Sequence, residues 1–290
     1  MRAFITGASG FVGTYLVKRL QQEGWAITTY DSATGGNICD TLLLQDRLEA
    51  ADPDIVFHLA AIANVRRASD EAARVFEVNT RGTHNVLEAM RTIGCKCKRI
   101  VFTSSCSVYG EPTQFPTTED TPMPVQTSLY GASKLAGEGL IQAYEATYGF
   151  KGTILRLATQ MGPGNPRGHV VDLHRKLKQG ANPLRVMGNG DQYKSYLYIE
   201  DCIDAFMYTL TTPGLFNVAG ECWTVRQSVN ELQRILGTNV AIEYGDQARG
   251  WAGDSPHIEP STERLRALGW APLVSTREAI VRTIEWLEGR

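Results

Sequence analysis

The sequence predicts an α/β protein in which a parallel sheet is covered by helices on both faces. Short strands that are apolar throughout alternate with helical segments in the first half of the chain, a pattern typical of a sheet buried on both sides. A glycine-rich turn, GASGFVG at 7–13, follows the first strand and opens a helix. The 290 residues, 43% of them hydrophobic, suffice for one large core or two unequal lobes.

The elements of the first half follow from the hydrophobic pattern. We expect strands at 2–6, 25–30, 54–60, 99–105 and 153–157, and helices at about 11–23, 41–50, 68–92 and 129–148. Gly24 ends the first helix. The helix at 68–92 is expected to break near Asn79.

After about residue 158 the pattern changes. Glycine and proline cluster in MGPGNPRG at 161–168, and the elements become short. We expect one domain at 1–158 and a smaller one at 159–290, some elements of which return to the sheet. No linker separates them, so both should fold as one body.

Composition excludes several classes of partner. The formal net charge is −2 and no long run of like charge occurs, which gives no sign of a nucleic-acid or polybasic membrane surface. The first strand begins at the second residue, and no apolar run approaches about 18 residues. We expect a soluble cytoplasmic protein with no nucleic-acid or membrane partner.

The six cysteines do not predict a metal site. They stand at 39, 95, 97, 106, 202 and 222. Cys95 and Cys97 form C-x-C, without the paired C-x-x-C spacing of structural zinc sites. We expect reduced thiols and no metal.

The glycines of GASGFVG fall at Gly7, Gly10 and Gly13. The pattern is weak alone, but between a strand and a helix it indicates a dinucleotide site. Glycines let the backbone approach a pyrophosphate, which then lies on helix N–H groups and the positive end of the helix dipole. A glycine-rich turn that only packs is the alternative.

Asp31 ends the second strand, 21 residues after Gly10. A carboxylate at this position can accept hydrogen bonds from both ribose hydroxyls of an adenosine. The next five residues, SATGG, offer no Arg or Lys to hold a 2′-phosphate, which favours NAD over NADP. A turn-capping role for Asp31 is the alternative.

The segment YGASK at 130–134 places Tyr130 and Lys134 on one face of a helix. The pKa of a free tyrosine is about 10, and a nearby ammonium and an oxidised nicotinamide both lower it. Tyr130 could then accept a proton from a sugar hydroxyl while hydride leaves the same carbon. Ser105, at the end of a strand and 25 residues upstream, could bind the same oxygen. The alternative is an exposed Tyr–Lys pair without function, but it explains the combination of Tyr130, Lys134 and Ser105 less well.

These residues resemble a known family. The chain is similar to the NAD-dependent epimerase/dehydratase group of extended short-chain dehydrogenase/reductases, and its pattern is closest to the nucleotide-sugar 4-epimerases. The resemblance covers nearly the whole chain, through GASGFVG, HLAA at 58–61, VNTRGTHNVLEA at 78–89, TSSCSVYGEP at 103–112, YGASK, GNGDQYKSYLYIEDC at 188–202 and RGWAGD at 249–254. It implies a Rossmann doubly wound domain with a seven-stranded parallel sheet that binds NAD. It also implies a smaller C-terminal domain that binds the sugar nucleotide.

The resemblance also implies roles for individual residues. Besides the glycines and Asp31, these are Phe11 and Val12 at the pyrophosphate, Asn37 and Ile38 near adenine, Leu59, Ala60 and Ala61 at the ribose and nicotinamide, Asn79 near the cofactor, Ser105, Tyr130 and Lys134 as the catalytic triad, and Thr159, Lys194 and Arg249 at the substrate phosphates. Tyr130 and Lys134 would also contact NAD, and Ser105 and Tyr130 the substrate.

Four of these positions depart from the family pattern. Asn37 replaces a usual Asp, Thr159 a usual Asn, and Lys194 a usual Arg, whose planar fork becomes a point charge. Arg249 lies two residues further from its Gly-Asp than in many relatives. Ile258 aligns with a wall position that limits bulk at C2 of the sugar.

The expected activity is 4-epimerisation of a nucleotide sugar, with a UDP-hexose as first choice, through a transient 4-keto sugar. A nucleotide 4-keto-sugar reductase is the alternative, and a non-catalytic cofactor-sensing protein ranks last because Tyr130 and Lys134 are both present. A dehydratase or decarboxylase would need a carboxylic acid just after Ser105, where Cys106 and Ser107 stand.

The family resemblance further implies a homodimer. Two helices of each subunit would form a four-helix bundle, here the helix after Asn79 and the helix at 129–148. Leu135, Leu140 and Ile141 suit such a seam, although packing within one chain explains them as well.

Overall fold

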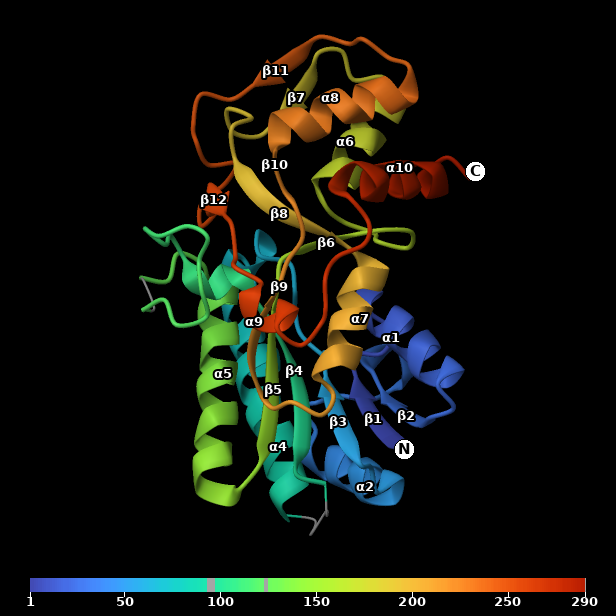
Figure 1. Ribbon diagram of the computed structural model, residues 1–290, viewed down its shortest axis with the longest axis vertical. Coiled ribbons are helices and arrows are strands. Elements are labelled where there is room, and N and C mark those ends of the chain that lie inside the picture. The colour runs from blue at the N-terminus through green and yellow to red at the C-terminus, as the bar shows by residue number, and fades with distance from the viewer. Residues whose placement is uncertain (93–96, 123–124, 290) are drawn as a thin grey trace.

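The computed structural model describes residues 1–92, 97–122 and 125–289. Its central layer is a parallel six-stranded sheet in the order β2-β1-β3-β4-β5-β9 (Figure 1). The strands are β1 (Arg2–Thr6), β2 (Ala26–Tyr30), β3 (Ile55–His58), β4 (Arg99–Ser105), β5 (Lys151–Leu157) and β9 (Gly214–Val218). The α/β class with a parallel sheet is therefore confirmed.

Helices cover both faces of this sheet. One face carries α1 (Phe11–Gln22) and α7 (Ile199–Thr209), and the other carries α2 (Thr41–Ala51), α4 (Gly82–Thr92) and α5 (Leu129–Tyr148). Successive side chains of a strand point to opposite faces. In β1, Ile5 accordingly packs in the same cluster as Leu16 of α1, and Phe4 in the same cluster as Leu48 of α2.

The sheet has six strands in the described part of the chain, so the expectation of seven is wrong. The connection from β2 to α2 spans only residues 31–40. It contains a 3₁₀ turn at Ser32–Thr34, which ends at Gly35 with φ 87°. A turn of this kind leaves no room for a further strand beyond β2, which therefore forms the edge.

The helical segment before β4 is interrupted as expected. It begins with a 3₁₀ turn at Arg67–Ser69 and α3 (Ala72–Val75), continues as a π-helical turn at Phe76–Arg81, and ends as α4. Asn79 lies in the π turn, a geometry that recurs at functional sites.

The helix that carries YGASK has the predicted bounds. Ser128 caps it, accepting a hydrogen bond from the backbone N–H of Gly131, and Gly149 ends it with φ 70°. Ile141 of this helix is fully buried within its own chain. Ile141 therefore cannot contribute to a seam between subunits.

The second lobe lies above the carboxyl ends of the strands (Figure 1). It contains β6 (Thr159–Met161), α6 (His169–Lys178), β7 (Leu184–Val186), β8 (Tyr193–Tyr198), β10 (Cys222–Thr224), α8 (Val225–Leu236), β11 (Ile242–Tyr244), β12 (His257–Ile258) and α10 (Thr276–Leu287), while α9 (Glu263–Arg266) packs on β9. Strand β8 is central, pairing with β6, β10 and β12.

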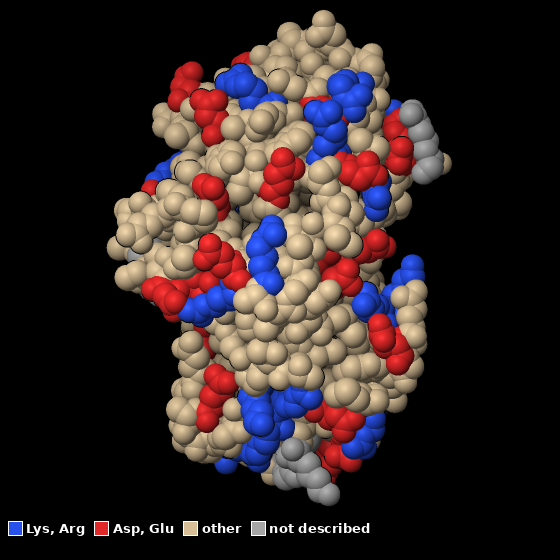
Figure 2. Space-filling view, in the orientation of Figure 1, with Lys and Arg blue, Asp and Glu red and all other residues tan. Residues whose placement is uncertain are grey.

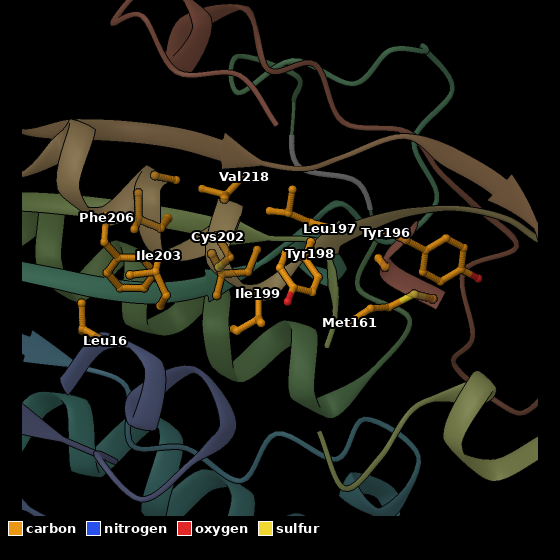
Figure 3. Close-up of a cluster of buried hydrophobic side chains, with 14 of the residues drawn as sticks. Leu16, Met161, Tyr196, Leu197, Tyr198, Ile199, Cys202, Ile203, Phe206 and Val218 are labelled. Carbon is orange, nitrogen blue, oxygen red and sulfur yellow. The ribbon is translucent and has the colours of Figure 1, made fainter. Parts of the chain in front are cut away.

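One hydrophobic core joins the lobes. Met161 and Tyr196 of the second lobe lie in the same cluster as Ile203 and Phe206 of α7, which cover the large sheet (Figure 3). Elements α7 and β9 thus return to the sheet from the later part of the sequence. The division at 158/159 stays a prediction.

The surface is mixed in charge. On the face shown in Figure 2, acidic and basic side chains both occur along the length of the molecule. Within the described residues no helix combines the length and apolarity needed to cross a bilayer. Cys39, Cys106, Cys202 and Cys222 are free thiols, and Cys95 lies outside the described residues.

Candidate active site

One large cavity of about 1750 Å³ opens at the carboxyl ends of the sheet strands, under the second lobe. Pockets for a single small ligand usually occupy about 300–1,000 Å³, so this one has room for a cofactor and a second ligand. The predicted site residues that line it are Gly7, Gly10, Phe11, Val12, Gly13, Asp31, Asn37, Ile38, Leu59, Ala60, Ala61, Ser105, Tyr130, Lys134, Thr159 and Lys194. Ile258 lines it as well.

The glycine turn is shaped by close backbone contacts. Gly7 has φ +74°, and a Cβ there would lie 2.6 Å from the backbone nitrogen of Ala60. A Cβ on Gly13 would lie 2.3 Å from the carbonyl oxygen of Gly7. Gly10 is the N-cap of α1 and offers no side-chain cap. The first N–H groups of α1 are therefore left for a bound anion.

Asp31 lines the cavity and also organises the turn after β2. Its carboxylate accepts hydrogen bonds from the Ser9 N–H at 2.9 Å, the Ser9 hydroxyl at 2.5 Å and the Ala33 N–H at 2.9 Å. Burial acts to raise the pKa of Asp31, but these three hydrogen bonds together hold it below its ordinary value. The side chain is therefore ionised at neutral pH, and the capping and ribose-binding interpretations are compatible.

The three predicted catalytic residues line the same cavity. Ser105 lies close enough to Tyr130 to act on the pKa of its phenol. The Lys134 ammonium donates to the carbonyl oxygen of Thr103 at 2.7 Å and lies 6.0 Å from the centre of the Tyr130 ring. Helix α5 supplies two of these side chains and the end of β4 supplies the third, so rigid elements hold all of them.

The expected lowering of the Tyr130 pKa does not come from the protein groups. Burial raises the pKa of Tyr130 to about 12, although the nearby Ser105 side chain acts to lower it. Burial also lowers the pKa of Lys134 to about 7, against the nearby charge of Glu138. The i, i+4 spacing does not show how deeply both groups are buried, and the lowering expected with an oxidised nicotinamide beside Tyr130 stays a prediction.

The residues after Ser105 form a short 3₁₀ turn, η4 (Cys106–Tyr109). The Cys106 thiol is buried and donates to the carbonyl oxygen of Arg156 at 3.3 Å. Burial raises the pKa of this thiol. The Ser105 hydroxyl donates to the Ser107 hydroxyl at 3.1 Å. No proton-transfer group stands beside Ser105 in this turn.

The far end of the cavity is lined by Thr159 and Lys194. The Lys194 ammonium pairs with the buried carboxylate of Asp254 and lies 5.0 Å from the centre of the Trp251 ring. Asp254 also accepts a hydrogen bond from the Gly250 N–H at 2.9 Å.

Two predicted site residues do not line the cavity. Arg249 is half-exposed and pairs with Glu111. Asn79 is buried; its amide accepts from the Ile62 N–H at 2.7 Å and donates to the Ser133 hydroxyl at 3.0 Å. It therefore ties the loop after β3 to α5, a positioning contact.

Sequence reasoning missed several residues at this site. Ser9, inside the glycine motif, binds Asp31. Glu138 lies four residues after Lys134, so the i, i+4 rule could have found it. Trp251, the aromatic residue within RGWAGD, lines the cavity, as does His169 at the start of α6. His169 carried no signal in the sequence, whereas the RGWAGD motif could have pointed to Trp251.

Comparisons with known proteins agree with this geometry. Residues 3–219 match the NAD dependent epimerase/dehydratase family. The chain is 30% identical to a UDP-glucose 4-epimerase of Mycolicibacterium smegmatis over 326 residues, which cover 100% of this chain and 99% of the relative. Among solved structures it is similar to the Thermus thermophilus UDP-glucose 4-epimerase in complex with NAD, with a TM-score of 0.89, 28% identity and coverage of 100% and 99%. It is also similar to the Bacillus cereus UDP-glucuronic acid 4-epimerase in complex with UDP-glucuronic acid and NAD, with a TM-score of 0.89, 25% identity and the same coverage. The chain therefore belongs to the NAD dependent epimerase/dehydratase family.

Proposed function

We propose that this chain is an NAD-dependent 4-epimerase of a UDP-hexose. The observation that carries the proposal is the position of Ser105, Tyr130 and Lys134. They lie in one cavity that also contains the glycine turn and Asp31, as well as Thr159 and Lys194. The relatives named above, which are epimerases of UDP-glucose and UDP-glucuronic acid, support the same reaction.

The cofactor end of the cavity fits NAD. A Cβ on Gly7 or Gly13 would fill the turn, and the open N-terminus of α1 suits a pyrophosphate. The ionised Asp31 suits a ribose with free hydroxyls. The residues that would hold the cofactor are Gly7, Gly10, Phe11, Val12, Gly13, Asp31, Asn37, Ile38, Leu59, Ala60, Ala61, Tyr130 and Lys134, with Asn79 supporting the site from behind.

The chemistry centres on one oxygen of the sugar. Tyr130 takes the proton of the C4 hydroxyl, and Ser105 donates a hydrogen bond to the same oxygen. NAD, when bound, supplies the acceptor and the donor of the C4 hydride and a positive ring that favours the phenolate form of Tyr130. The ammonium of Lys134, which lies 6.0 Å from the centre of the Tyr130 ring, also favours the phenolate form. After the 4-keto sugar has turned over, Tyr130 returns the proton to the oxygen.

The turn after Ser105 offers no carboxylic acid for expelling water or carbon dioxide. The turn after Ser105 offers only a buried thiol of raised pKa, at Cys106, and a hydroxyl, at Ser107. A 4,6-elimination needs an acid and a base at such positions. Oxidation and reduction at C4 are the steps that these residues support, so a 4-keto-sugar reductase remains the second candidate.

The substrate phosphates would lie at Thr159 and Lys194. Arg249 could reach them only after leaving Glu111, so we keep it as a weaker candidate. We also retain the sequence-based proposals of a cytoplasmic location and of NAD-binding and substrate-binding domains at 1–158 and 159–290.

The activity is tested by incubating the protein with UDP-, GDP-, dTDP- and CDP-hexoses. Chromatography and mass spectrometry then identify the product. An unchanged mass with a changed retention time is expected for epimerisation. Loss of one water would contradict our interpretation of Cys106 and Ser107. Net consumption of a reduced cofactor, and its release on gel filtration, would favour the reductase.

We further propose a homodimer through α4 and α5, which lie side by side (Figure 1). Phe76, at the start of the π-helical turn before α4, and Leu129, the first residue of α5, are 58% and 48% exposed, and Leu135 and Leu140 are partly buried. Light scattering is expected to give twice the mass of the chain. A monomer at working concentration would overturn the proposal.

A further inference from the structure

A buried ion pair lies one helical turn beyond the catalytic lysine. Glu138 of α5 and Arg156 of β5 have side chains that are 2% and 1% exposed. They share two parallel hydrogen bonds, from the Arg156 Nε at 2.9 Å and from its Nη2 at 2.7 Å. This bidentate arrangement fixes the carboxylate in both distance and orientation. Neither residue lines the cavity.

Glu138 is connected to the catalytic residues in two ways. It follows Lys134 by four residues, and Lys134 follows Tyr130 by four, so the three side chains share one face of α5. In addition, the Ser104 hydroxyl donates to the Glu138 carboxylate at 2.5 Å. Ser104 stands between Ser105 and the residue whose carbonyl oxygen accepts from Lys134. Glu138 therefore fixes the part of β4 that carries Ser105 and that accepts the hydrogen bond of Lys134.

Arg156 is itself anchored from other elements. Its Nη1 donates to the Tyr109 hydroxyl at 2.8 Å. Tyr109 in turn donates to the Asn217 side chain of β9 at 2.9 Å, and the Asn217 N–H donates to the Glu119 carboxylate at 2.8 Å. Since these groups are buried and hydrogen-bonded to one another, the position of Glu138 is set by three neighbouring elements.

The charge of Glu138 matters because Lys134 is buried. Burial lowers the pKa of Lys134 to about 7, and the Glu138 carboxylate opposes that effect. The other titratable groups around the pair are His58 of β3, Cys106 and Tyr109 of η4, and Glu119 of the segment before α5. Burial lowers the pKa of His58 to about 3 and raises the pKa of both Cys106 and Tyr109, so these three are neutral at pH 7. The Glu119 carboxylate accepts a hydrogen bond from the Asn217 N–H.

We propose that Glu138 is a positioning residue of the active site: held by Arg156, it balances the buried ammonium of Lys134 and, through Ser104, fixes the end of β4 that carries Ser105. The residue contacts neither of the two ligands of the cavity. It acts through the groups that do. The inference deepens the proposed function, on which it rests for its kinetic readout.

The test follows the protonation of Lys134 directly. Isotope-labelled lysine is incorporated into the full chain, and its side-chain NMR shifts are recorded against pH; the Lys134 resonance is assigned by its loss in Lys134→Met. In Glu138→Gln we expect the pKa of Lys134 to fall by about one unit, because a neighbouring opposite charge has been removed. Titration of Lys134 at the wild-type pH in a folded Glu138→Gln protein would overturn the proposal.

A second variant covers the possibility that Glu138→Gln does not fold, since it leaves Arg156 buried without its partner. Glu138→Gln/Arg156→Met removes both charges and is expected to fold. It should also show a fall in the Lys134 pKa, smaller than in Glu138→Gln because the positive charge of Arg156 is removed as well, and an unchanged pKa in this variant would equally overturn the proposal. Glu231→Gln is the matched control: it removes a buried carboxylate from an ion pair with Arg234 on α8 and should leave Lys134 unaffected.

Enzyme kinetics separate the effect of the Glu138 charge on Lys134 from the effect of its hydrogen bond with Ser104. In Glu138→Gln, the loss of activity at rising pH should begin at a lower pH by the same shift. Ser104→Ala, which keeps the charge, should lower kcat without moving the pH profile. If no nucleotide sugar is turned over at all, the proposed function fails, whereas the NMR titration still decides on Glu138.

Discussion

The two ends of the cavity are built in different ways. At the cofactor end, the shape comes from backbone packing: a Cβ on Gly7 would lie 2.6 Å from the Ala60 nitrogen, and Asp31 is fixed by hydrogen bonds from Ser9 and Ala33. At the substrate end, the shape comes from side chains of segments far apart in sequence. Lys194 of β8 pairs there with Asp254, which lies 60 residues further on.

This difference explains which part of the site is specified locally. A turn that requires glycines and a strand that ends in Asp leave a short, recognisable pattern in the sequence. An ion pair between distant segments leaves none, because either partner alone is an ordinary charged residue. The cofactor end should therefore be sensitive to changes in backbone volume, and the substrate end to changes in side-chain charge.

The largest effect is expected where the two ends meet. Tyr130→Phe removes the phenol that takes the C4 proton, while the ring still fills its buried position. We expect turnover to fall by about a hundredfold to ten-thousandfold, with NAD affinity and thermal stability close to those of the wild type. Initial rates and NAD titration measure both. A rate for the Tyr130→Phe variant near that of the wild type would contradict the mechanism.

The cofactor end can be tested with two glycines of equal φ. Gly7 and Gly24 both have φ +74°, but a Cβ on Gly24 meets nothing within 4 Å. In Gly7→Ala the methyl group would push against the backbone of Leu59 and Ala60, at a cost of about 3 kcal/mol. We expect NAD affinity to fall by about a hundredfold.

Gly24→Ala carries only the strain of its left-handed backbone. It should lose about 1 kcal/mol of unfolding free energy and keep its NAD affinity. Calorimetric NAD titration of both variants makes the comparison. Equal losses of affinity would show that backbone conformation, rather than the contact with Ala60, is what the site requires.

A smaller effect is expected at Asp31. Asp31→Ala removes the acceptor proposed for the ribose hydroxyls, worth about 1.5–3 kcal/mol for a charged group, so NAD should bind about tenfold to a hundredfold more weakly. NADP should lose less, because the negative charge that opposes its 2′-phosphate is removed as well. Competitive titration of the two cofactors gives the ratio. Tighter binding of NADP than of NAD by the unaltered protein would contradict the assignment.

Much of the fold could be predicted because local signals dominate it. The apolar strands, the Ser128 cap and Gly149 stop of α5 and the break near Asn79 all have short-range causes. The expectation of seven strands is wrong. It followed from the family resemblance, whereas the ten residues that connect β2 to α2 in this chain form no strand.

Within the site, the sequence identified groups but not their surroundings. It placed Tyr130 and Lys134 on one helix face, yet the rise of the Tyr130 pKa to about 12 depends on burial that only the folded chain provides. For the same reason it could not show that Glu111 holds Arg249 outside the cavity.

The smallest effects are expected at the substrate end, where Lys194 and Arg249 offer a direct comparison. Lys194→Gln removes a charge from inside the cavity but can still donate a hydrogen bond to Asp254, so the buried carboxylate is not left without a partner. We expect KM for the nucleotide sugar to rise about tenfold with kcat nearly unchanged, because a phosphate contact is made equally in the ground and transition states. Arg249→Gln breaks a half-exposed pair with Glu111. Such pairs contribute about 0–1 kcal/mol, so KM should rise by less than about threefold. If Arg249→Gln instead raises KM more than Lys194→Gln does, then Arg249 leaves Glu111 to bind the substrate, and the substrate end is assembled only when the nucleotide sugar enters.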